Sequence, residues 1–476
     1  MDKSGSRILC VDLDGTLILS DALFETAVAV LRKNPLRALL FPFWLLGGKA
    51  RFKRRLSSMC GADDLEFPFS EDVVSYVRGR VQGGAKAYLA TASDSLVAGK
   101  IADRLGFFEG VFASDGAVNL KGAEKAAFLE EMFGTGNFSY IGNDSCDIDV
   151  WKVSDGIVLA NCSKTLEKKV RSEFPSKEIE VVGKPRRLSV SCAARLMRVH
   201  QWAKNLLVFV PLIVAHKYFN PGDVFASILA FVSFCLCASG TYIINDIFDA
   251  GNDRRHCQKR FRPVASGEVS FPGAALAAAF LLFLGLLPAL FLPEGFRAVL
   301  AAYTALTFLY SAYIKKKVLL DVMCLAILYN IRIYAGIHSI VVEISFWLFA
   351  FSLFIFLSLA FLKRFVEIRA VGKEVVRGRG YAGGDREIIA VLGTSSGLIS
   401  ALIFIMYIEN SAHLYYGNSN ILLLGVLPII FFICRIWIRA FRGEVDSDPV
   451  LSAVKDPANY LLILIMAALF LASGPL

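Results

Sequence analysis

The sequence predicts a soluble N-terminal domain followed by an all-α membrane domain that crosses the bilayer about nine times. Of the 476 residues, 55% are hydrophobic and 38 are phenylalanines, a composition typical of a membrane protein. Residues 1–185 mix charged and apolar side chains, whereas residues 186–476 are dominated by apolar stretches of roughly 17–25 residues, the length that spans a hydrocarbon core. We therefore expect two domains, divided between residues 185 and 186.

Nine apolar stretches follow one another in the second domain, and each is a candidate membrane span. The first is the least regular, because Arg198, His200 and Lys204 precede its apolar part. The candidate spans are residues 197–216, 222–246, 271–292, 295–314, 318–338, 344–363, 387–409, 420–438 and 457–474.

Basic residues alternate between the connections of these spans. The connections after the second, fourth, sixth and eighth spans hold clusters of Lys and Arg, whereas the opposite connections offer little beyond Lys217 and Arg297. Lys and Arg concentrate on the cytoplasmic side, so we expect these loops to face the cytoplasm across the inner (plasma) membrane. The N-terminal domain should share that side, because its first apolar stretch is interrupted by Asp12 and Asp14 and is not a signal peptide. No nucleic-acid partner is expected, and the oligomeric state stays open.

An acidic and then basic cluster directly follows the second candidate span. Asn245, Asp249 and Asp253 recur every fourth residue, so on a continuing helix they share one face and present oxygen ligands suited to Mg²⁺. A metal ion held there could bind a diphosphate. Lys259 and Arg262 come just after it, where cationic donors could bind the remaining phosphate oxygens.

Two structural alternatives stay open for these charges. Asp249 and Asp253 could form only a salt-bridge network with Arg254 and Lys259 at a helix end. Basic residues around Lys363 could simply extend their charged ends to the membrane interface. A functional role is favoured by the polar residues inside neighbouring spans, where they are costly unless used. They are Tyr310, Asp321, Tyr329, Asn330, Arg332 and Tyr334.

These residues carry a resemblance to a known family. Asn245-Asp246-x-x-Asp249-x-x-x-Asp253, followed by Arg262-Pro263-x-x-Ser266-Gly267, resembles the first aspartate-rich motif of the UbiA-type intramembrane prenyltransferases. The resemblance covers essentially all of 190–476. Five ordered segments look like the decaprenyl-phosphate phosphoribosyltransferase branch of that superfamily, with Cys257 standing where that branch usually has proline. They are Arg198 to Asn205, Asp253 to Pro263, Tyr310 to Asp321, Arg332 to Gly336 and Lys363 to Glu367.

The resemblance implies that Mg²⁺ holds the diphosphate of 5-phosphoribosyl diphosphate and that a polyprenyl phosphate is the acceptor. An already anionic acceptor needs no general base, so a single displacement with inversion is expected. The implied metal ligands are Asn245, Asp246, Asp249, Asp253 and Asp321, of which Asp249 and Asp253 are catalytic. The implied substrate-binding residues are Lys204, Asn205, Lys259, Arg262, Tyr310, Lys315, Arg332, Lys363 and Arg364.

Two other functions remain as alternatives. A quinone- or aromatic-type prenyltransferase would use a prenyl diphosphate donor, with an accessory or inactive N-terminal domain. A transporter carrying a regulatory phosphatase would show flux without release of diphosphate, and it leaves the gathering of acids and bases at the helix ends unexplained.

The N-terminal domain carries a motif of its own. Arg7 to Val11 is a predicted buried strand, and Asp12-Leu13-Asp14-Gly15-Thr16 follows at its end. This string resembles motif I of the haloacid dehalogenase (HAD) superfamily. The resemblance implies an α/β Rossmann-like fold with its catalytic groups at the carboxyl ends of the strands. Asp12 would be the nucleophile that forms an aspartyl-phosphate, and Asp14 would be the general acid and base.

Three further HAD motifs follow in order. Leu89-Ala90-Thr91-Ala92-Ser93 looks like motif II, with the Thr91 hydroxyl on the phosphate, and Lys125 is preferred to Lys121 as the motif III cation. Tyr140-Ile141-Gly142-Asn143-Asp144-x-x-Asp147 resembles motif IV, in which Asn143 replaces the usual metal-binding aspartate and offers no charge to Mg²⁺. Asp144 is the alternative ligand. The implied metal ligands are Asp12, Asp14, Asn143 and Asp147.

An insertion from Leu17 to about residue 80 stands in the position of a helical cap. Its segment Leu36 to Leu56 is first apolar and then basic, and is too short to span a bilayer. It suits an element that lies on anionic lipid. The alternative is that Phe41 to Leu46 pack inside the cap.

The fusion suggests two consecutive reactions. The expected transferase product still bears a phosphomonoester, which is the substrate class of a HAD phosphatase. We therefore expect a bifunctional membrane enzyme whose N-terminal domain removes the 5-phosphate and supplies a lipid-linked pentose for a cell-envelope glycan. Tethering raises the effective concentration of the second site without new contacts.

Overall fold

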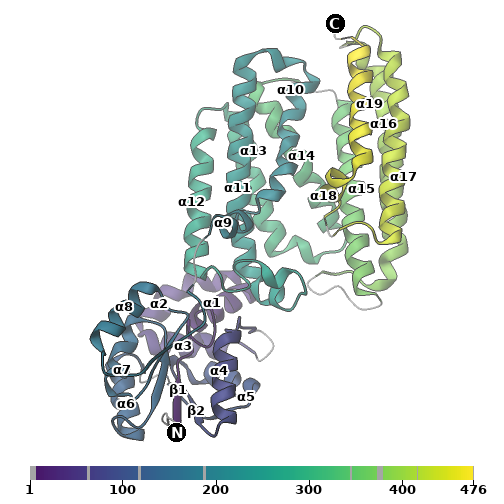
Figure 1. Ribbon diagram of the computed structural model, residues 1–476. Helices are drawn as coiled ribbons and strands as arrows, with labels where there is room; N and C mark the ends of the chain where they lie inside the picture. Colours follow the sequence, from purple (N-terminus) through teal and green to yellow (C-terminus); the bar gives the residue numbers. More distant parts are fainter. Residues whose placement is uncertain are drawn as a thin grey trace. The chain divides into compact units, whose positions relative to one another are not determined.

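The chain forms two compact units, which are seen in the computed structural model (Figure 1). Unit 1 contains Met1–Met197 and Ile243–Ala277, and unit 2 contains Arg198–Tyr242 and Ala278–Leu476. The structure describes residues 7–61, 65–115, 119–185, 189–343, 346–372, 379–414, 416–446 and 448–474. The described residues therefore leave out 186–188 at the predicted domain boundary, 344–345 of the predicted sixth span and 373–378 of a predicted basic loop.

Unit 1 is built on a six-stranded parallel sheet with the strand order β3-β2-β1-β4-β5-β6. The central strand β1 pairs Leu9 with Ala87 of β2 on one side and with Ser139 of β4 on the other. The winding of the chain reverses beside β1, where the carboxyl ends of an open parallel sheet form a crevice for ligands. The strands are β1 Ile8–Val11, β2 Lys86–Asp94, β3 Phe108–Ser114, β4 Ser139–Gly142, β5 Ile157–Ala160 and β6 Ile179–Val182.

Helices cover both faces of this sheet, because successive side chains of a strand point to opposite faces. In β1, Leu9 and Val11 pack in one core with residues of α4 and α5, whereas Cys10 packs in another with residues of α6, α7 and α8. This arrangement confirms the predicted α/β architecture of the N-terminal domain. The helices are α4 Glu71–Gln82, α5 Ser95–Leu105, α6 Ala123–Phe133, α7 Ile148–Val153 and α8 Lys164–Glu173.

The predicted cap region is helical. Some side chains of its apolar segment pack inside the cap, and others are exposed at its surface. The Phe41 ring packs against Trp44 and Phe52, with ring centroids 5.7 and 5.5 Å apart, as in a cap core. Leu39, Phe43 and Leu46 are instead 71%, 70% and 85% exposed, as in a surface that lies on a membrane. The helices are α1 Ala22–Lys33, η1 Pro35–Leu40, α2 Phe41–Leu46 and α3 Lys49–Ser58.

Long apolar helices dominate the second half of the chain. Among the described residues, six helices are long and apolar enough to cross a membrane, or seven if α18 and α19, which are bent by 80° at their junction, form one span. The predicted count of nine spans is therefore not confirmed. The predicted first span is the 3-10 helix η4, Val199–Phe209, followed by the short α10, Val210–Val214, because charged residues interrupt its apolar pattern.

The remaining helices of this half follow the predicted spans closely. α13 coincides with the predicted fourth span, although it is not among the six helices that are apolar enough to cross. The helices are α11 Pro221–Arg254, α12 Phe271–Ala289, α13 Glu294–Ala312, α14 Leu320–Ile340, α15 Phe346–Val371, α16 Arg386–Asn410, α17 Val426–Arg442, α18 Pro449–Lys455 and α19 Pro457–Ala472.

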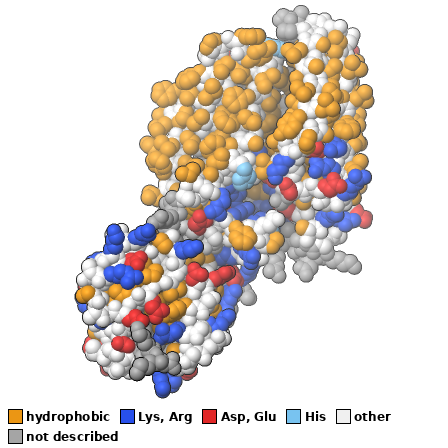
Figure 2. All heavy atoms as spheres, in the orientation of Figure 1, with side chains coloured by type: hydrophobic (Ala, Val, Ile, Leu, Met, Phe, Trp, Pro, Cys, Tyr) orange, Lys and Arg blue, Asp and Glu red, His pale blue; other side chains and the backbone are white. Residues whose placement is uncertain are grey.

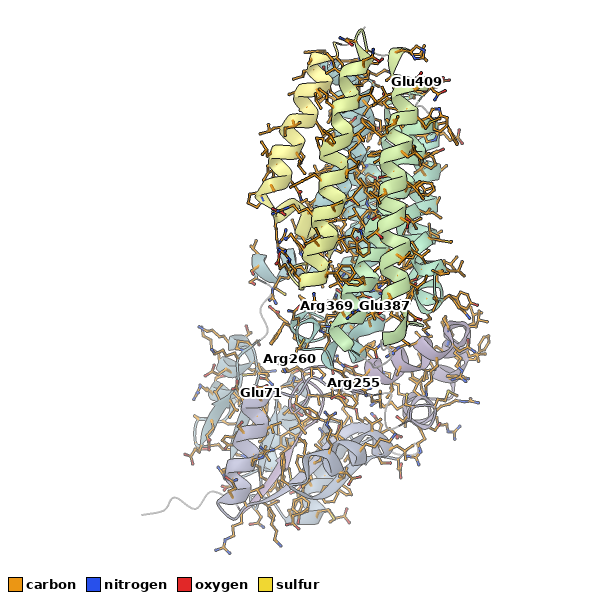
Figure 3. The ribbon with its side chains drawn as sticks, turned by 90° about the vertical axis from the view of Figure 1, so that its right-hand side faces the viewer. Glu71, Arg255, Arg260, Arg369, Glu387 and Glu409 are labelled. Carbon is orange, nitrogen blue, oxygen red and sulfur yellow. The ribbon has the colours of Figure 1, made fainter. Side chains whose placement is uncertain are left out.

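The surface of unit 2 separates apolar from charged side chains. Hydrophobic side chains cover most of its face in Figure 2, and Lys, Arg, Asp and Glu gather at one end of its helices. Figure 3 shows Arg369 and Glu387 at that end and Glu409 at the opposite end of α16. A broad apolar surface with charged side chains gathered at one end fits a helical bundle that spans a bilayer with its basic end on one side.

Two glycines allow α11 and α12 to lie in direct contact. A Cβ atom at Gly285 would lie 2.6 Å from the Sγ atom of Cys237, and one at Gly240 would lie 2.8 Å from Cγ of Leu282. Ser233 of α11 also donates a hydrogen bond of 2.5 Å to the carbonyl of Gly285. Small residues let membrane helices approach closely, so the contact between α11 and α12 requires residues without a side chain at positions 240 and 285.

Replacement of Gly285 by leucine should separate α11 from α12. We expect Gly285→Leu to destabilise the protein by about 1–3 kcal/mol, because the new side chain has no space. Thermal unfolding of the full-length protein in detergent measures this effect. Leu286→Phe is the matched control, since Leu286 is 54% exposed on the same helix and its replacement should change stability by less than about 0.5 kcal/mol. Equal unfolding temperatures for the two variants would contradict the proposed contact.

Candidate active sites

The crevice beside β1 brings together three of the predicted HAD motifs. Asp12 directly follows β1, Thr91 lies in the second half of β2, and Asn143 directly follows β4. Because β2 and β4 are the two neighbours of β1, the carboxyl ends of all three strands meet at one edge of the sheet. The backbone N–H of Asp12 donates to the carbonyl of Ile141 at 2.9 Å and thereby joins motifs I and IV.

Lys125 is the cation of this crevice. Its Nζ atom lies 2.7 Å from Asp12 Oδ1 and 3.9 Å from Asp147 Oδ1, and it donates a hydrogen bond of 2.8 Å to the Tyr140 hydroxyl. Burial alone would lower the pKa of Lys125, but the carboxylates of Asp12 and Asp147 raise it, so the side chain is charged. The structure places Lys125 at Asp12, whereas Lys121 is exposed.

Asp14 lies where the sheet meets the first cap helix. Its two carboxylate oxygens accept hydrogen bonds from the backbone N–H of Ala22 at 2.7 Å and from the Ser93 hydroxyl at 2.6 Å. Burial, followed by the charges of Asp21 and Asp12, raises the pKa of Asp14 to about 7. A carboxyl group that titrates near neutral pH suits a general acid that later acts as a base.

Motif II contributes one residue that the sequence prediction did not assign. Thr91, predicted to hold the phosphate, is fully buried, and its hydroxyl accepts a hydrogen bond of 3.0 Å from the backbone N–H of Ser93. Ser93 in turn holds Asp14. Its position within the quoted string Leu89 to Ser93 is the signal that could have identified it.

Motif IV lies directly against motif I. Gly15 has a positive φ of 76°, and a Cβ atom there would lie only 2.2 Å from Nδ2 of Asn143. Asp147 accepts hydrogen bonds from the backbone N–H groups of Asn143 and Asp144 at 3.0 and 3.1 Å, and from the Tyr140 hydroxyl at 3.1 Å. Asp144, the predicted alternative ligand, is exposed and caps the short helix η3, Ser145–Asp147.

The donors in this crevice fit a hard cation that keeps most of its water. Within the described part of the chain, no group of three or more His, Cys, Asp or Glu side chains is arranged to hold a metal ion. Mg²⁺ often binds through only one or two carboxylates and retains several waters. Asp12 and Asn143 offer such oxygens, whereas the oxygens of Asp147 already accept three hydrogen bonds.

Lys53 and Arg54 tie the cap to the same crevice. Lys53 Nζ donates to the carbonyl of Ala92 at 2.7 Å, and Arg54 donates to the Ser95 hydroxyl at 3.0 Å and lies 3.5 Å from Asp94. Burial lowers the pKa of Lys53, and Asp14 is among the charges that act on it. These two residues belong to the basic part of the segment Leu36 to Leu56, and no sequence pattern predicted their contacts with motif II and the start of α5.

The aspartate-rich motif lies on the last turns of α11, so the predicted continuing helix is confirmed. Arg262 donates to Asp246 at 3.1 Å and to Asp253 at 2.6 Å, and both acids are buried. Asn245 and Asp249 are half-buried on the same helix. The cation predicted to bind phosphate therefore lies within reach of the predicted metal ligands. Lys259 begins the short helix η6, Lys259–Phe261, and is half-buried.

Asp321 and Arg364 form a buried ion pair in unit 2. Arg364 Nε lies 2.5 Å from Asp321 Oδ2, and both side chains are buried. Tyr381 donates to the other Asp321 oxygen at 2.6 Å, and Arg364 also pairs with Glu367. The predicted metal ligand Asp321 and the predicted substrate-binding residue Arg364 are thus partners of each other. The Tyr310 hydroxyl is a further partner of Arg364 and accepts a hydrogen bond from it at 2.9 Å.

A second group of predicted residues gathers around Arg332. Its Nε donates to the Asn205 side chain at 2.8 Å, its Nη2 donates to the Tyr303 hydroxyl at 3.1 Å, and its Nη1 donates to the carbonyl of Leu328. Arg332 is buried, as are Asn205 and Tyr303. All three of these contacts are with neutral groups, so they do not cancel its positive charge.

Lys204 pairs with a residue that no sequence pattern singled out. Its ammonium group forms a salt bridge with Asp448, which caps the N-terminus of α18. Burial alone would raise the pKa of Asp448, but the charges of Lys204 and Lys363 lower it to about 2. Lys315 is half-buried in the short helix η7, Ile314–Lys316, and its carbonyl accepts from Arg379 at 3.4 Å.

Comparison with known proteins places the chain in a family. Residues 206–455 match the model of the UbiA prenyltransferase family. An uncharacterized protein of Sinorhizobium fredii, y4nM, is 34% identical over 469 residues, which cover 97% of this chain and 90% of that protein. The similarity therefore extends over both halves of the chain.

Two further similarities concern one half each. The decaprenyl-phosphate phosphoribosyltransferase of Mycolicibacterium smegmatis is 33% identical over 198 residues, which cover 41% of this chain and 62% of that protein. A solved structure of a substrate-bound phosphoserine phosphatase covers 38% of this chain and 96% of that chain, with 15% identity and a TM-score of 0.26. The second likeness is too distant to carry an argument on function.

Replacement of Asp321 by asparagine should weaken the fold of unit 2. We expect a loss of about 1–3 kcal/mol, because Arg364 keeps its salt bridge with Glu367 but loses its charged partner Asp321. Thermal unfolding in detergent measures the loss. Glu409→Gln is the control, since Glu409 is exposed at the end of α16 and should contribute little. An unchanged stability of the Asp321→Asn variant would show that the ion pair is not a structural element.

Proposed function

This chain belongs to the UbiA prenyltransferase family, and we propose that its membrane region transfers 5-phosphoribose from phosphoribosyl diphosphate to a polyprenyl phosphate. The N-terminal domain then removes the 5-phosphate of the product and leaves a lipid-linked pentose for a cell-envelope glycan. Both steps take place at the cytoplasmic side of the inner membrane, which the basic loops favour. The similarity to a decaprenyl-phosphate phosphoribosyltransferase supports this choice of substrates.

Arg332 is the observation that carries the proposal for the membrane region. A charged side chain inside a membrane domain is costly and is retained where it serves a function. The contacts of Arg332 with Asn205, Tyr303 and Leu328 are all with neutral groups, so an anionic substrate that reached it would meet an uncancelled positive charge. Phosphoribosyl diphosphate and a polyprenyl phosphate together bring several phosphate groups, and a guanidinium group binds phosphate through paired hydrogen bonds.

The aspartate-rich motif serves the leaving diphosphate in this proposal. Mg²⁺ bound by Asn245, Asp249 and Asp253 would neutralise charge on the departing group. Arg262, which contacts Asp246 and Asp253, is close enough to share the same diphosphate. The acceptor phosphate attacks the anomeric carbon of ribose from the opposite side as the bond to diphosphate breaks. Because this oxygen is already anionic, no protein base takes part.

Residues of the β1 crevice account for the second reaction. Asp12 attacks the phosphorus of the 5-phosphate and forms an aspartyl-phosphate, while the departing ribose oxygen takes a proton from Asp14. Asp14 next takes a proton from a water molecule, whose oxygen attacks the same phosphorus and releases phosphate and free Asp12. Lys125 stabilises the negative charge throughout. Mg²⁺ on Asp12 and Asn143 would neutralise the phosphoryl oxygens.

The two reactions are separated by measuring two products. Full-length protein in lipid nanodiscs, supplied with phosphoribosyl diphosphate and decaprenyl phosphate, should release both diphosphate and phosphate. Asp12→Asn should release diphosphate at the normal rate and accumulate the lipid that still carries the 5-phosphate. Asp249→Ala combined with Asp253→Ala should reduce diphosphate release by about 100-fold or more, because the metal ligands are lost.

Asp223→Ala is the matched control for the acidic motif, because Asp223 lies in the first turn of the same helix α11. It should leave both products unchanged. Full transfer by the Asp249/Asp253 double variant would refute the transferase proposal. Phosphate release by Asp12→Asn at the wild-type rate would refute the phosphatase proposal. Transfer from a prenyl diphosphate to an aromatic acceptor, without use of phosphoribosyl diphosphate, would favour the quinone-type alternative.

The phosphatase should need more Mg²⁺ in acid. Burial and the neighbouring acids raise the pKa of Asp14 to about 7, and burial and the charge of Asp12 raise that of Asp147 to about 6. Below these values the carboxyl groups carry protons, so the crevice has less negative charge to attract a cation. We expect the Mg²⁺ concentration for half-maximal hydrolysis of p-nitrophenyl phosphate to rise about tenfold from pH 8 to pH 6. Equal values at both pH values would contradict this assignment.

A further inference from the structure

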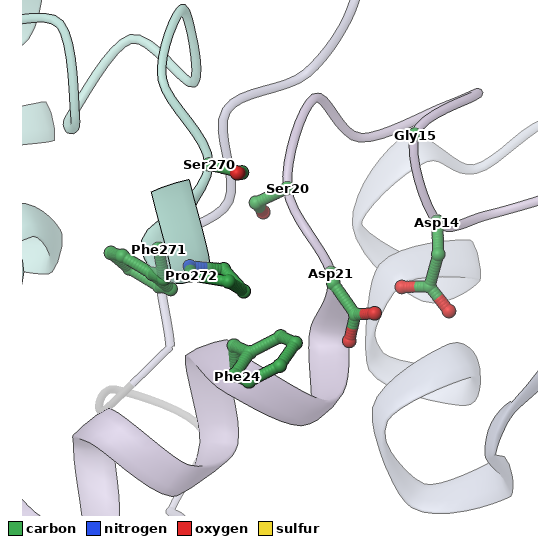
Figure 4. A pocket seen from close by; sticks show the side chains of 8 residues that line it. All are labelled: Asp14, Gly15, Ser20, Asp21, Phe24, Ser270, Phe271 and Pro272. Atoms are coloured by element: carbon green, nitrogen blue, oxygen red, sulfur yellow. The ribbon is translucent and has the colours of Figure 1, made fainter. Parts of the chain in front are cut away.

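A pocket beside Asp14 has walls from two distant parts of the sequence (Figure 4). Its volume of about 180 Å³ is far above the roughly 10–15 Å³ that one water needs, so a group such as a sugar ring can enter. Figure 4 shows Asp14 and Asp21 on one side of the space and Phe24, Phe271 and Pro272 on the other. The lining residues are Asp14, Gly15, Ser20, Asp21 and Phe24, together with Ser270, Phe271 and Pro272.

A buried ion pair holds the second wall in place. Arg254, the residue after Asp253 of the aspartate-rich motif, donates two hydrogen bonds, of 2.9 and 2.7 Å, to the carboxylate of Glu25 in α1. Arg254 Nε also donates to the carbonyl of Ala265 at 2.8 Å, and both charged side chains are almost fully buried. This buried ion pair fixes the position of the two segments, because separating them would leave each buried charge without its partner.

The backbone of the same segment touches the loop that follows motif I. Gly267 has a positive φ of 75°, and a Cβ atom there would lie 2.7 Å from the Cβ of Leu19 and 3.2 Å from Cγ of Pro68. Only glycine permits both this conformation and this distance. The segment that leads to residues 270–272 is therefore held at two points, Arg254 and Gly267.

The pocket changes from polar to apolar with distance from the phosphatase acids. Ser20 and Asp21 stand near Asp14 and offer hydrogen-bond partners of the kind that sugar hydroxyls use. Phe24 is 40% exposed and Pro272 is exposed as well, and together with Phe271 they form an apolar side. A soluble sugar phosphate has no group that would cover these side chains.

The apolar side is also the beginning of a membrane helix. Phe271 is the first residue of α12, Phe271–Ala289, which is long and apolar enough to cross a bilayer. Side chains at the first turn of such a helix lie at the level of the membrane interface. A substrate anchored in the bilayer by an isoprenoid chain can therefore reach this pocket without leaving the membrane.

We propose that this pocket selects a phosphomonoester whose sugar is joined to an isoprenoid lipid, and that Phe24, Phe271 and Pro272 are its specificity-determining residues. The proposal rests on the phosphatase activity proposed above and adds the residues that select its lipid-linked substrate over a soluble one. The sugar occupies the polar part beside Asp14, and the first isoprene units cover the apolar side. The transferase segment thus completes the phosphatase site, and the phosphatase acts on a lipid rather than on a soluble sugar phosphate.

The test compares two substrates that differ only in the lipid. Full-length protein in nanodiscs is assayed with synthetic farnesyl-phosphoryl-5-phosphoribose and with ribose 5-phosphate, and the ratio of the two kcat/KM values is the selectivity. Phe24→Ala and Pro272→Ala should each lower this ratio about tenfold, chiefly through a higher KM for the lipid substrate, because apolar contacts of this size discriminate by about that factor. Both positions are exposed, so the variants should fold.

Met132→Ala is the matched control, because Met132 is 51% exposed on α6 and does not line the pocket. Its selectivity should equal that of the wild type. Glu25→Gln weakens the ion pair with Arg254, and Glu25 does not line the pocket. This variant should shift KM for the lipid substrate in the same direction as Phe24→Ala. A ratio that stays unchanged in Phe24→Ala and Pro272→Ala would overturn the proposed specificity, while hydrolysis that depends on Asp12 persists. Absence of any hydrolysis that depends on Asp12 would instead overturn the phosphatase activity itself.

Discussion

Charge buried away from water is the constraint on which both units depend, because a buried ion without a partner destabilises a protein by several kcal/mol. Lys125 meets Asp12 across 113 residues of sequence, and Arg254 meets Glu25 across 229. Each pair can form only when distant parts of the chain have folded together. The same charges that would carry catalysis therefore also specify the tertiary structure, and a substrate phosphate enters a site whose cations are already held in position.

Local patterns in the sequence were sufficient to predict the elements that carry the motifs. A short apolar run before Asp12 indicates a buried strand, and acids at every fourth residue up to Asp253 indicate one helix face. Both depend on the periodicity of neighbouring residues. The convergence of Asp12, Thr91 and Asn143 follows from a further rule, that parallel strands carry their ligands at the same edge. These parts of the fold and of the crevice could therefore be predicted without knowing which side chains are in contact.

The partners of these residues could not be predicted in the same way. Ser93 donates a hydrogen bond to Asp14, and Asp448 forms a salt bridge with Lys204. No spacing in the sequence predicts either contact. Lys53 belongs to a segment whose basic residues suit a lipid surface, and its hydrogen bond to motif II could not be predicted from that pattern. The predicted number of spans is not confirmed, for a related reason. Apolar length alone does not distinguish a spanning helix from the interrupted η4 and α10 segment.

The contact of Arg254 with Glu25 gives the two proposed activities a physical reason to share one chain. Asp253 and Arg254 are neighbours in sequence, Glu25 lies in the first turn of α1, and the N–H of Ala22 in that same turn holds the carboxylate of Asp14. The acid motif of the transferase and the acid of the phosphatase are thus joined through one ion pair and one turn of helix. In the proposed sequence of reactions, a lipid product that stays in the bilayer would meet the second site at a concentration set by the tether, and not by diffusion through the membrane. Separate proteins would have to form this buried ion pair between two surfaces, and each surface would otherwise leave an exposed charge beside an apolar pocket.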